Sequence, residues 1–148
     1  MRFKTLTAVT TAAALLAVGG STATAAPSTG SWSGELSQDL ALLDEPYTTK
    51  FGIQALHGRI ALVNVEVRMA CGEYAIRDAQ VFKHWRSGRG PQLNNGGFTF
   101  RAHANWGNKD VGVIRVSGQL GRRNATGTAT ASGDGCRGEG DWTAKRRF

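Results

Sequence analysis

The stretch Tyr47–Met69, YTTKFGIQALHGRIALVNVEVRM, decides the fold. Apolar and polar residues alternate on both sides of the dipeptide His57-Gly58. Alternation with a period of two around a glycine turn predicts a β-hairpin, because successive side chains of a strand point to opposite faces. We expect the odd-numbered residues of both strands to face the core, and Ile60 with the other even-numbered residues to face outward.

The rest of the chain continues this pattern in shorter runs. Phe98 to Trp106 alternates strictly, and the glycines between Gly118 and Gly140 permit tight turns but weaken a helix. Leu36 to Leu43 fits either a strand or one turn of helix. These features predict an all-β fold, an antiparallel β-sandwich or barrel of about six to eight short strands with at most one short helical turn. The predicted core includes Val63, Val65, Val67, Phe98, Phe100, Trp106 and Trp142.

Residues 1–25 have the three parts of a secretory signal peptide. Two basic residues precede an uncharged run from Leu6 to Val18, and Ala23-Thr24-Ala25 matches the small-residue cleavage site. The apolar run is shorter than the roughly 20 residues that a membrane-spanning helix needs. We therefore expect cleavage after this segment and secretion of residues 26–148 as a single extracellular domain, monomeric and without a membrane span.

Cys71 and Cys136 are the two cysteines of the chain. Outside the cytosol, a lone pair of cysteines is most simply a disulfide bond. Two cysteines are too few for a zinc ribbon, and no His or Cys pair has the spacing of metal ligands. We therefore predict one disulfide between these residues, no metal site and no cofactor.

Several different short motifs follow one another along the chain. They are Trp32-x-Gly34, a hairpin ending in Cys71, Gly97-Phe98, Val116-x-Gly118, Ala125-Thr126-Gly127-Thr128, and a second Cys followed by Trp142-Thr143-Ala144. In these motifs the chain resembles the small exported β-sandwich proteins of unknown function found in many soil bacteria. The resemblance supports the fold and the disulfide, and it implies no catalytic residues.

The most distinctive polar segment is a basic cluster at the start of a predicted loop, Lys83 to Asn95. The whole chain carries a formal net charge of +7. Basic groups attract anionic polymers by releasing counterions, and an indole ring stacks on sugars or bases. An alternative is that the tryptophan covers the core and the charges are only solvated. The candidate binding residues are Lys83, His84, Trp85, Arg86 and Arg89.

Three functions remain open on the sequence. We favour a secreted module without catalysis that binds an anionic extracellular polymer or a cell-wall glycan, with nucleic acid bound only through non-specific charge. The second is a small secreted ribonuclease-like hydrolase, in which Glu66, Arg68, Arg101 and His103 would act together if their strands were neighbours. The third is a protein-binding module, such as an inhibitor of an exported enzyme. No nucleophile or metalloprotease motif occurs, so no catalytic residue is assigned.

Overall fold

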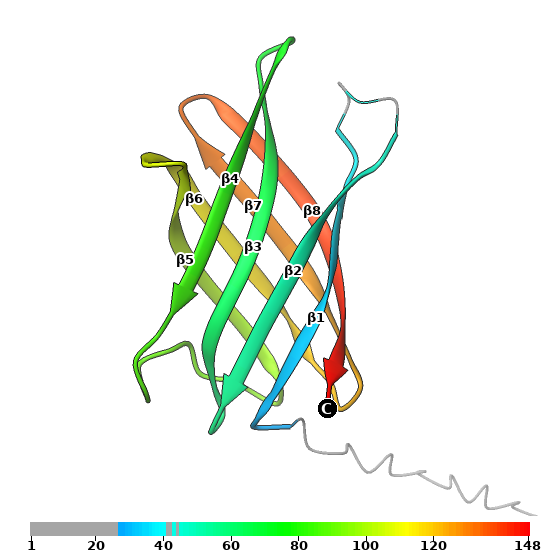
Figure 1. Ribbon diagram of the computed structural model, residues 1–148, viewed down its shortest axis with the longest axis vertical. Helices are drawn as coiled ribbons and strands as arrows, with labels where there is room; N and C mark the ends of the chain where they lie inside the picture. Colours follow the sequence, from blue (N-terminus) through cyan, green and yellow to red (C-terminus); the bar gives the residue numbers. More distant parts are fainter. Residues whose placement is uncertain (1–26, 41–42, 44) are drawn as a thin grey trace, which may run out of the picture.

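The computed structural model describes residues 27–40, 43 and 45–148, so the predicted signal peptide lies outside the described residues. Each strand is antiparallel to the next, and β1 also pairs with β8, which closes the sheet into a barrel (Figure 1). The described residues contain no helix, and therefore none that could cross a membrane. The predicted all-β antiparallel fold is confirmed. The strands are β1 (Gly30–Gln38), β2 (Tyr47–Leu56), β3 (Arg59–Cys71), β4 (Ala75–His84), β5 (Gly97–Trp106), β6 (Lys109–Leu120), β7 (Asn124–Gly133) and β8 (Cys136–Arg147).

The predicted hairpin is formed by β2 and β3 around His57-Gly58, where both residues have a positive φ. The register between the strands shifts next to Ala55, because Ala61 is an extra residue in β3. This β-bulge turns two consecutive side chains inward. The prediction that Ile60 faces outward is therefore wrong, since this side chain is only 1% exposed.

The barrel interior is filled by aromatic and β-branched side chains. The indole of Trp142 stacks on Phe51, with the ring centroids 4.2 Å apart and the planes 9° from parallel. Gly118 and Gly127, paired on β6 and β7, leave the space for this indole, because an added Cβ would lie 2.2 Å and 2.5 Å from it. Close packing of this kind makes the interior sensitive to a single added methyl group.

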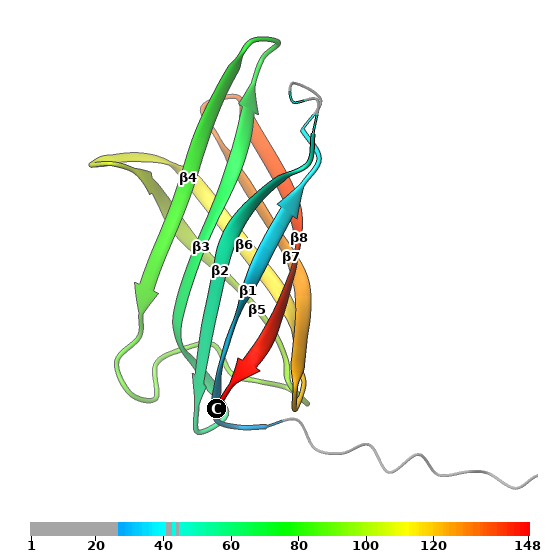
Figure 2. The same ribbon diagram turned by 45° about the vertical axis from the view of Figure 1, so that its right-hand side comes forward.

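The predicted core is confirmed at six of its seven positions, all of them buried, and wrong at Trp106. This side chain is 52% exposed. It lies at the tip of the β5–β6 hairpin, where the register shifts beyond Ala104 because Val111 is an extra residue in β6. The tip projects away from the other strands (Figure 2), so no facing strand covers the ring.

The up-and-down order of the strands gives the barrel two distinct ends. The β1–β2, β3–β4, β5–β6 and β7–β8 connections lie at one end, which we call the disulfide end. The β2–β3, β4–β5 and β6–β7 connections and the C-terminus lie at the other, which we call the loop end (Figure 1). The segment between β4 and β5, residues 85–96, passes across the loop end (Figure 2).

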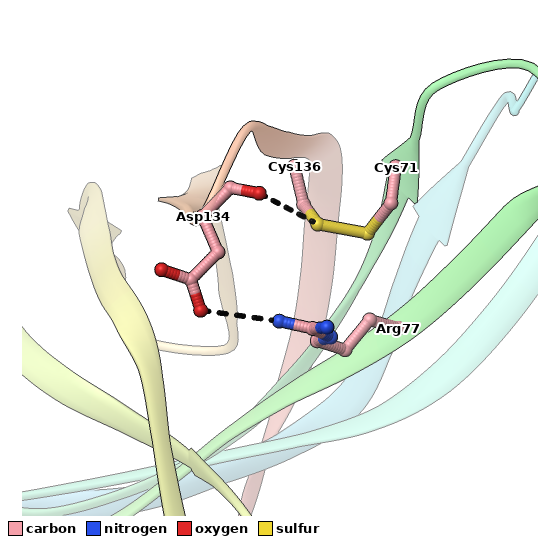
Figure 3. The surroundings of a disulfide bond; sticks show 4 residues. All are labelled: Cys71, Arg77, Asp134 and Cys136. Atoms are coloured by element: carbon pink, nitrogen blue, oxygen red, sulfur yellow. Dashed lines mark hydrogen bonds and ion pairs between the residues drawn. A yellow bond between two sulfur atoms is a disulfide. The ribbon is translucent and has the colours of Figure 1, made fainter.

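The disulfide end is held by a covalent bond between β3 and β8. Cys71 and Cys136 form the predicted disulfide, with a Cα–Cα distance of 4.2 Å (Figure 3). Cys71 is the last residue of β3, and Cys136 is the first residue of β8. Beside the bond, the guanidinium of Arg77 lies 3.3 Å from the carboxylate of Asp134 (Figure 3). The disulfide therefore joins two hairpins that are far apart in the sequence.

A buried glutamine makes a second link at this end. The amide nitrogen of Gln38 donates to the carbonyl oxygens of Arg68 at 2.9 Å and Glu139 at 3.3 Å. Its amide oxygen accepts a bond of 2.7 Å from the backbone N–H of Arg68. Gln38 is 1% exposed, so one side chain at the end of β1 satisfies backbone groups of β3 and β8 without help from water.

Candidate functional site

The segment 85–96 is held across the loop end by backbone hydrogen bonds. The N–H of Ile60 donates to the carbonyl of Pro91 at 2.8 Å, and the N–H of Leu93 donates to the carbonyl of Gly58 at 2.8 Å. At Gly90, an added Cβ would lie 1.6 Å from the carbonyl oxygen of Ile60, so only glycine fits there. The segment thus follows the β2–β3 turn closely.

The predicted binding residues stay together, but the loop begins later than predicted. Lys83 and His84 are the last two residues of β4, and Trp85, Arg86 and Arg89 follow it. The N–H of Arg89 donates to the carbonyl of Arg86 at 3.0 Å, which closes a turn. All of these side chains except Trp85 are exposed, so their charges point into solvent.

Trp85 is half-buried and joins the loop to the core. Its ring meets Phe100 edge-on, with the centroids 5.3 Å apart and the planes at 76°. Its backbone N–H donates to the carbonyl of Ala61 at 2.9 Å. Edge-to-face packing between aromatic rings stabilises beyond the area that it buries. The tryptophan therefore anchors the basic segment, and only part of its surface faces outward.

A cavity of about 430 Å³ lies between this segment and the β2–β3 turn. The cavity combines an apolar floor with a rim of cationic and imidazole side chains, a composition that suits a ligand with both a ring and a negative charge. Residues of the β2–β3 turn line it, and the sequence prediction missed them. The floor is formed by Leu56, Ile60, Ala61 and Trp85, and the rim by His57, Arg59, His84 and Arg86.

The loop end concentrates positive charge. Its turns and strand ends, residues 57–59, 83–96, 119–124 and 145–148, contain no Asp or Glu. Within the part of the chain that the structure describes, no ion pair lies at this end. No carboxylate of the described residues neutralises these charges, while Arg59 donates to the carbonyl of Gly90 and Arg146 to that of Thr29. The basic side chains gathered there are Arg59, Lys83, Arg86, Arg89, Arg122, Arg123, Lys145, Arg146 and Arg147.

Carboxylates gather at the opposite end of the barrel. There the chain places Asp39, Glu45, Glu73, Asp110 and Asp134 in or beside the connections. Two of these five carboxylates belong to ion pairs, with Arg77 and His103. The molecule thus has a basic loop end and an opposite, acidic end, where these carboxylates outnumber the basic residues Arg77, Lys109 and Arg137.

The residues of the hydrolase alternative are not brought together. Glu66 and Arg68 lie on β3, whereas Arg101 and His103 lie on β5. The strands are not neighbours, because β4 stands between them. His103 instead lies 3.1 Å from Asp110. The neighbouring strands that the hydrolase alternative requires are therefore not present.

Arg68 already has partners of its own. Its guanidinium lies 2.7 Å from the carboxylate of Asp78 and 3.5 Å from the ring centroid of Tyr47. The hydrogen bond to Asp78 raises the pKa of Arg68. Burial raises the pKa of the Tyr47 hydroxyl, and the positive charge of Arg68 opposes that change. The arginine thus stabilises the outer face of β3 and is not free to hold a phosphate.

Within residues 27–40, 43 and 45–148, no group of three or more His, Cys, Asp or Glu side chains could hold a metal ion. Asp134 faces Arg77, and its neighbour Cys136 is in the disulfide. Oxygen-rich cation sites need several carboxylates or carbonyls converging on one point. The acidic end therefore offers no built cation site in the described chain.

Comparison of the chain with protein-family models, with curated proteins and with solved structures finds no match. The resemblance to small exported β-sandwich proteins consequently rests on the sequence motifs alone. Function has to be argued from the site, since fold by itself does not determine function.

Proposed function

We propose that the protein is a secreted, non-catalytic module whose loop end binds an anionic extracellular polymer, such as a cell-wall glycan with acidic groups. One observation carries the proposal: three basic segments, distant in sequence, meet at one end of the barrel, without an acidic residue among them. The signal-peptide pattern and the disulfide support an extracellular setting.

The cavity gives this end more than charge. A sugar ring entering it would contact Trp85 and Leu56 on the floor. An acidic substituent on the same ring would meet the guanidinium groups of Arg59 and Arg86 at the rim. The guanidinium group of an arginine binds a carboxylate or phosphate through two parallel hydrogen bonds, so the interaction depends on direction as well as on charge. Flanking charges at Arg122 and Arg146 would follow the polymer beyond the cavity.

The test compares binding of the secreted chain to three immobilised polyanions: polygalacturonate, polyphosphate and RNA. The variant Arg86→Ala/Arg89→Ala should bind all three more weakly and with a smaller dependence on salt, because it makes fewer phosphate or carboxylate contacts. The matched control Lys109→Ala/Arg137→Ala removes two charges at the disulfide end and should bind like the unmodified protein. Equal losses in both variants would contradict a site at the loop end.

The three polyanions also distinguish what the cavity recognises. A glycan site predicts that Trp85→Phe weakens retention on polygalacturonate more than on polyphosphate, because only the former offers a ring to the indole. Binding to RNA should follow charge alone and disappear at high salt. RNA recovered after incubation should be intact, and its cleavage by the purified chain would favour the hydrolase alternative.

A further inference from the structure

The join between β4 and β5 differs from every other join in the barrel. Only Gln80 and Asn105 are paired across it. By contrast, β4 is paired with β3, and β5 with β6, over the whole length of the strand. The barrel therefore has a seam along its side, where one edge of β4 and one edge of β5 face each other without a continuous ladder. Unpaired strand edges are ready-made templates for another strand.

The seam is a depression of about 510 Å³ with a distinct floor and rim. Val81 and Ala102 belong to the inward-facing positions and form an apolar floor. Phe82, Lys83 and Arg101 stand around it, and all three side chains are exposed. An inserted strand alternates its side chains between two faces. One set would contact the floor, and the other would lie beside the basic rim.

The two strands of the seam, and the turn before β4, carry exposed apolar side chains. Phe82 is 72% exposed on β4, and Tyr74 is 92% exposed in the turn that leads into the strand. Ile76 on β4 and Trp106 at the end of β5 are exposed as well. Among the described residues, four of the six large exposed apolar side chains thus belong to the strands of the seam or to that turn. Of these four, Phe82 lines the depression and offers an apolar contact to a partner.

We propose that the seam between β4 and β5 binds an extended acidic segment of a partner protein by β-strand addition. The backbone edges of β4 and β5 supply the hydrogen bonds, the floor takes alternate apolar side chains, and the rim selects carboxylates. Neither Lys83 nor Arg101 has an ion-pair partner among the described residues, whereas His103 is already paired with Asp110. A second copy of this chain fits less well, since it would bring the same basic rim.

The seam is a second site beside the cavity at the loop end: Trp85 lines both, and Lys83 belongs to the basic side chains of the loop end as well as to the rim of the seam. Residues that belong to one site alone therefore separate the two proposals. The rim residue Arg101 lies on β5 and does not line the cavity at the β2–β3 turn. Conversely, Arg86 and Arg89 do not line the seam. Loss of one binding activity with retention of the other therefore shows which proposal has failed.

The experiment uses hydrogen exchange of the secreted chain with a capped peptide of alternating Glu and Val as the probe. In the free protein, amides on the open edges of β4 and β5 should exchange faster than amides in the β5–β6 and β7–β8 ladders. Millimolar peptide should slow the former and leave the latter unchanged. Equal protection of all these amides without peptide, or no slowing with peptide, overturns the proposal.

A charge swap tests the rim. The variant Arg101→Glu should weaken binding of the Glu-Val peptide by about tenfold or more, because like charges would then face each other. A Lys-Val peptide should bind this variant better than it binds the unmodified chain. The matched control is Arg137→Glu on β8, which is exposed and does not line the seam. Equal losses in the two variants, or no rescue by the Lys-Val peptide, contradict the proposed strand addition.

Discussion

Both ends of the barrel carry exposed or half-buried arginines, but the surroundings of these arginines differ. At the disulfide end, Arg77 faces Asp134 beside the covalent link of β3 to β8. At the loop end, Arg86 and Arg89 form no ion pair within the described residues, and the segment that carries them is held by backbone hydrogen bonds and Trp85. One end thus combines a covalent link with an ion pair, while the other exposes positive charges to solvent.

This division follows from the topology. In an up-and-down barrel every second connection lies at the same end, so segments far apart in sequence meet there. The basic stretches around residues 83–89, 122–123 and 145–147 share one end for this reason. Changes at the disulfide end should then alter stability, and changes of charge at the loop end should alter binding.

The largest effect is expected from removing the disulfide with Cys71→Ala/Cys136→Ala. The bond spans 65 residues of sequence, so the chain-entropy model assigns it about 4 kcal/mol of the free energy of unfolding. Urea unfolding of the variant and of the unmodified chain measures this loss directly. Under conditions where the variant remains folded, its binding to polygalacturonate should be unchanged. Loss of binding by the folded variant would show that the two ends are coupled.

A smaller loss of stability is expected at the loop end itself, from Trp85→Ala. Full burial of a Trp side chain is worth about 3–5 kcal/mol against Ala, and this ring is half-buried against Phe100, so we expect about 2–3 kcal/mol. Thermal and urea unfolding provide the measurement. Trp85→Phe should restore most of the stability, because a ring would still meet Phe100. A loss below about 0.5 kcal/mol would mean that the tryptophan does not anchor the segment.

The sequence predicted those parts of the fold that depend on local periodicity. The hairpin around His57-Gly58 and the buried face of β5 follow from alternation alone. Ile60 was assigned to the wrong face, because the bulge at Ala61 arises from pairing between strands. A single extra residue reverses the alternation of inward and outward side chains, and the sequence of the bulged strand alone does not indicate where the bulge lies. Trp106 was assigned to the core, because alternation does not show that the tip of the β5–β6 hairpin projects away from the other strands (Figure 2).

Only part of the candidate site was predicted, because the sequence shows which residues are adjacent in the chain but not which segments meet in the fold. The basic cluster was found because its charges are adjacent in sequence, and so are Arg122 and Arg123. His57 and Arg59 were missed as rim residues, since their position beside Arg86 depends on how the segment 85–96 crosses the barrel end. In an up-and-down barrel every second connection lies at the same end. The strand order would therefore have predicted that the β2–β3 turn lies close to the segment 85–96.

The next prediction concerns the buried link at the disulfide end. Gln38→Ala removes three hydrogen bonds and leaves buried backbone groups of Arg68 and Glu139 without partners. Such groups cost about 1–3 kcal/mol, and we expect a loss of about 2 kcal/mol in urea unfolding. Gln38→Glu is the matched variant, because it keeps the shape but replaces the amide donor by an acceptor. It should recover little of the stability, and full recovery would show that shape alone matters.

The smallest effect on stability, and the sharpest test of the comparison, is expected from Arg86→Ala/Arg89→Ala. Both side chains are exposed and lack ion-pair partners among the described residues, so their removal should change the free energy of unfolding by less than about 0.5 kcal/mol. Binding to polyphosphate should nevertheless weaken, most strongly at low salt, where the charges are least screened.

The control for this pair lies at the other end of the barrel. Arg77→Ala breaks the ion pair with Asp134 and should lower stability slightly, because exposed pairs contribute about 0–1 kcal/mol. It should not weaken binding to polyphosphate, because both Arg77 and Asp134 lie at the disulfide end, remote from the proposed binding site. If Arg77→Ala weakened binding as much as Arg86→Ala/Arg89→Ala, net charge would explain the attraction. That result would contradict a binding site at the loop end.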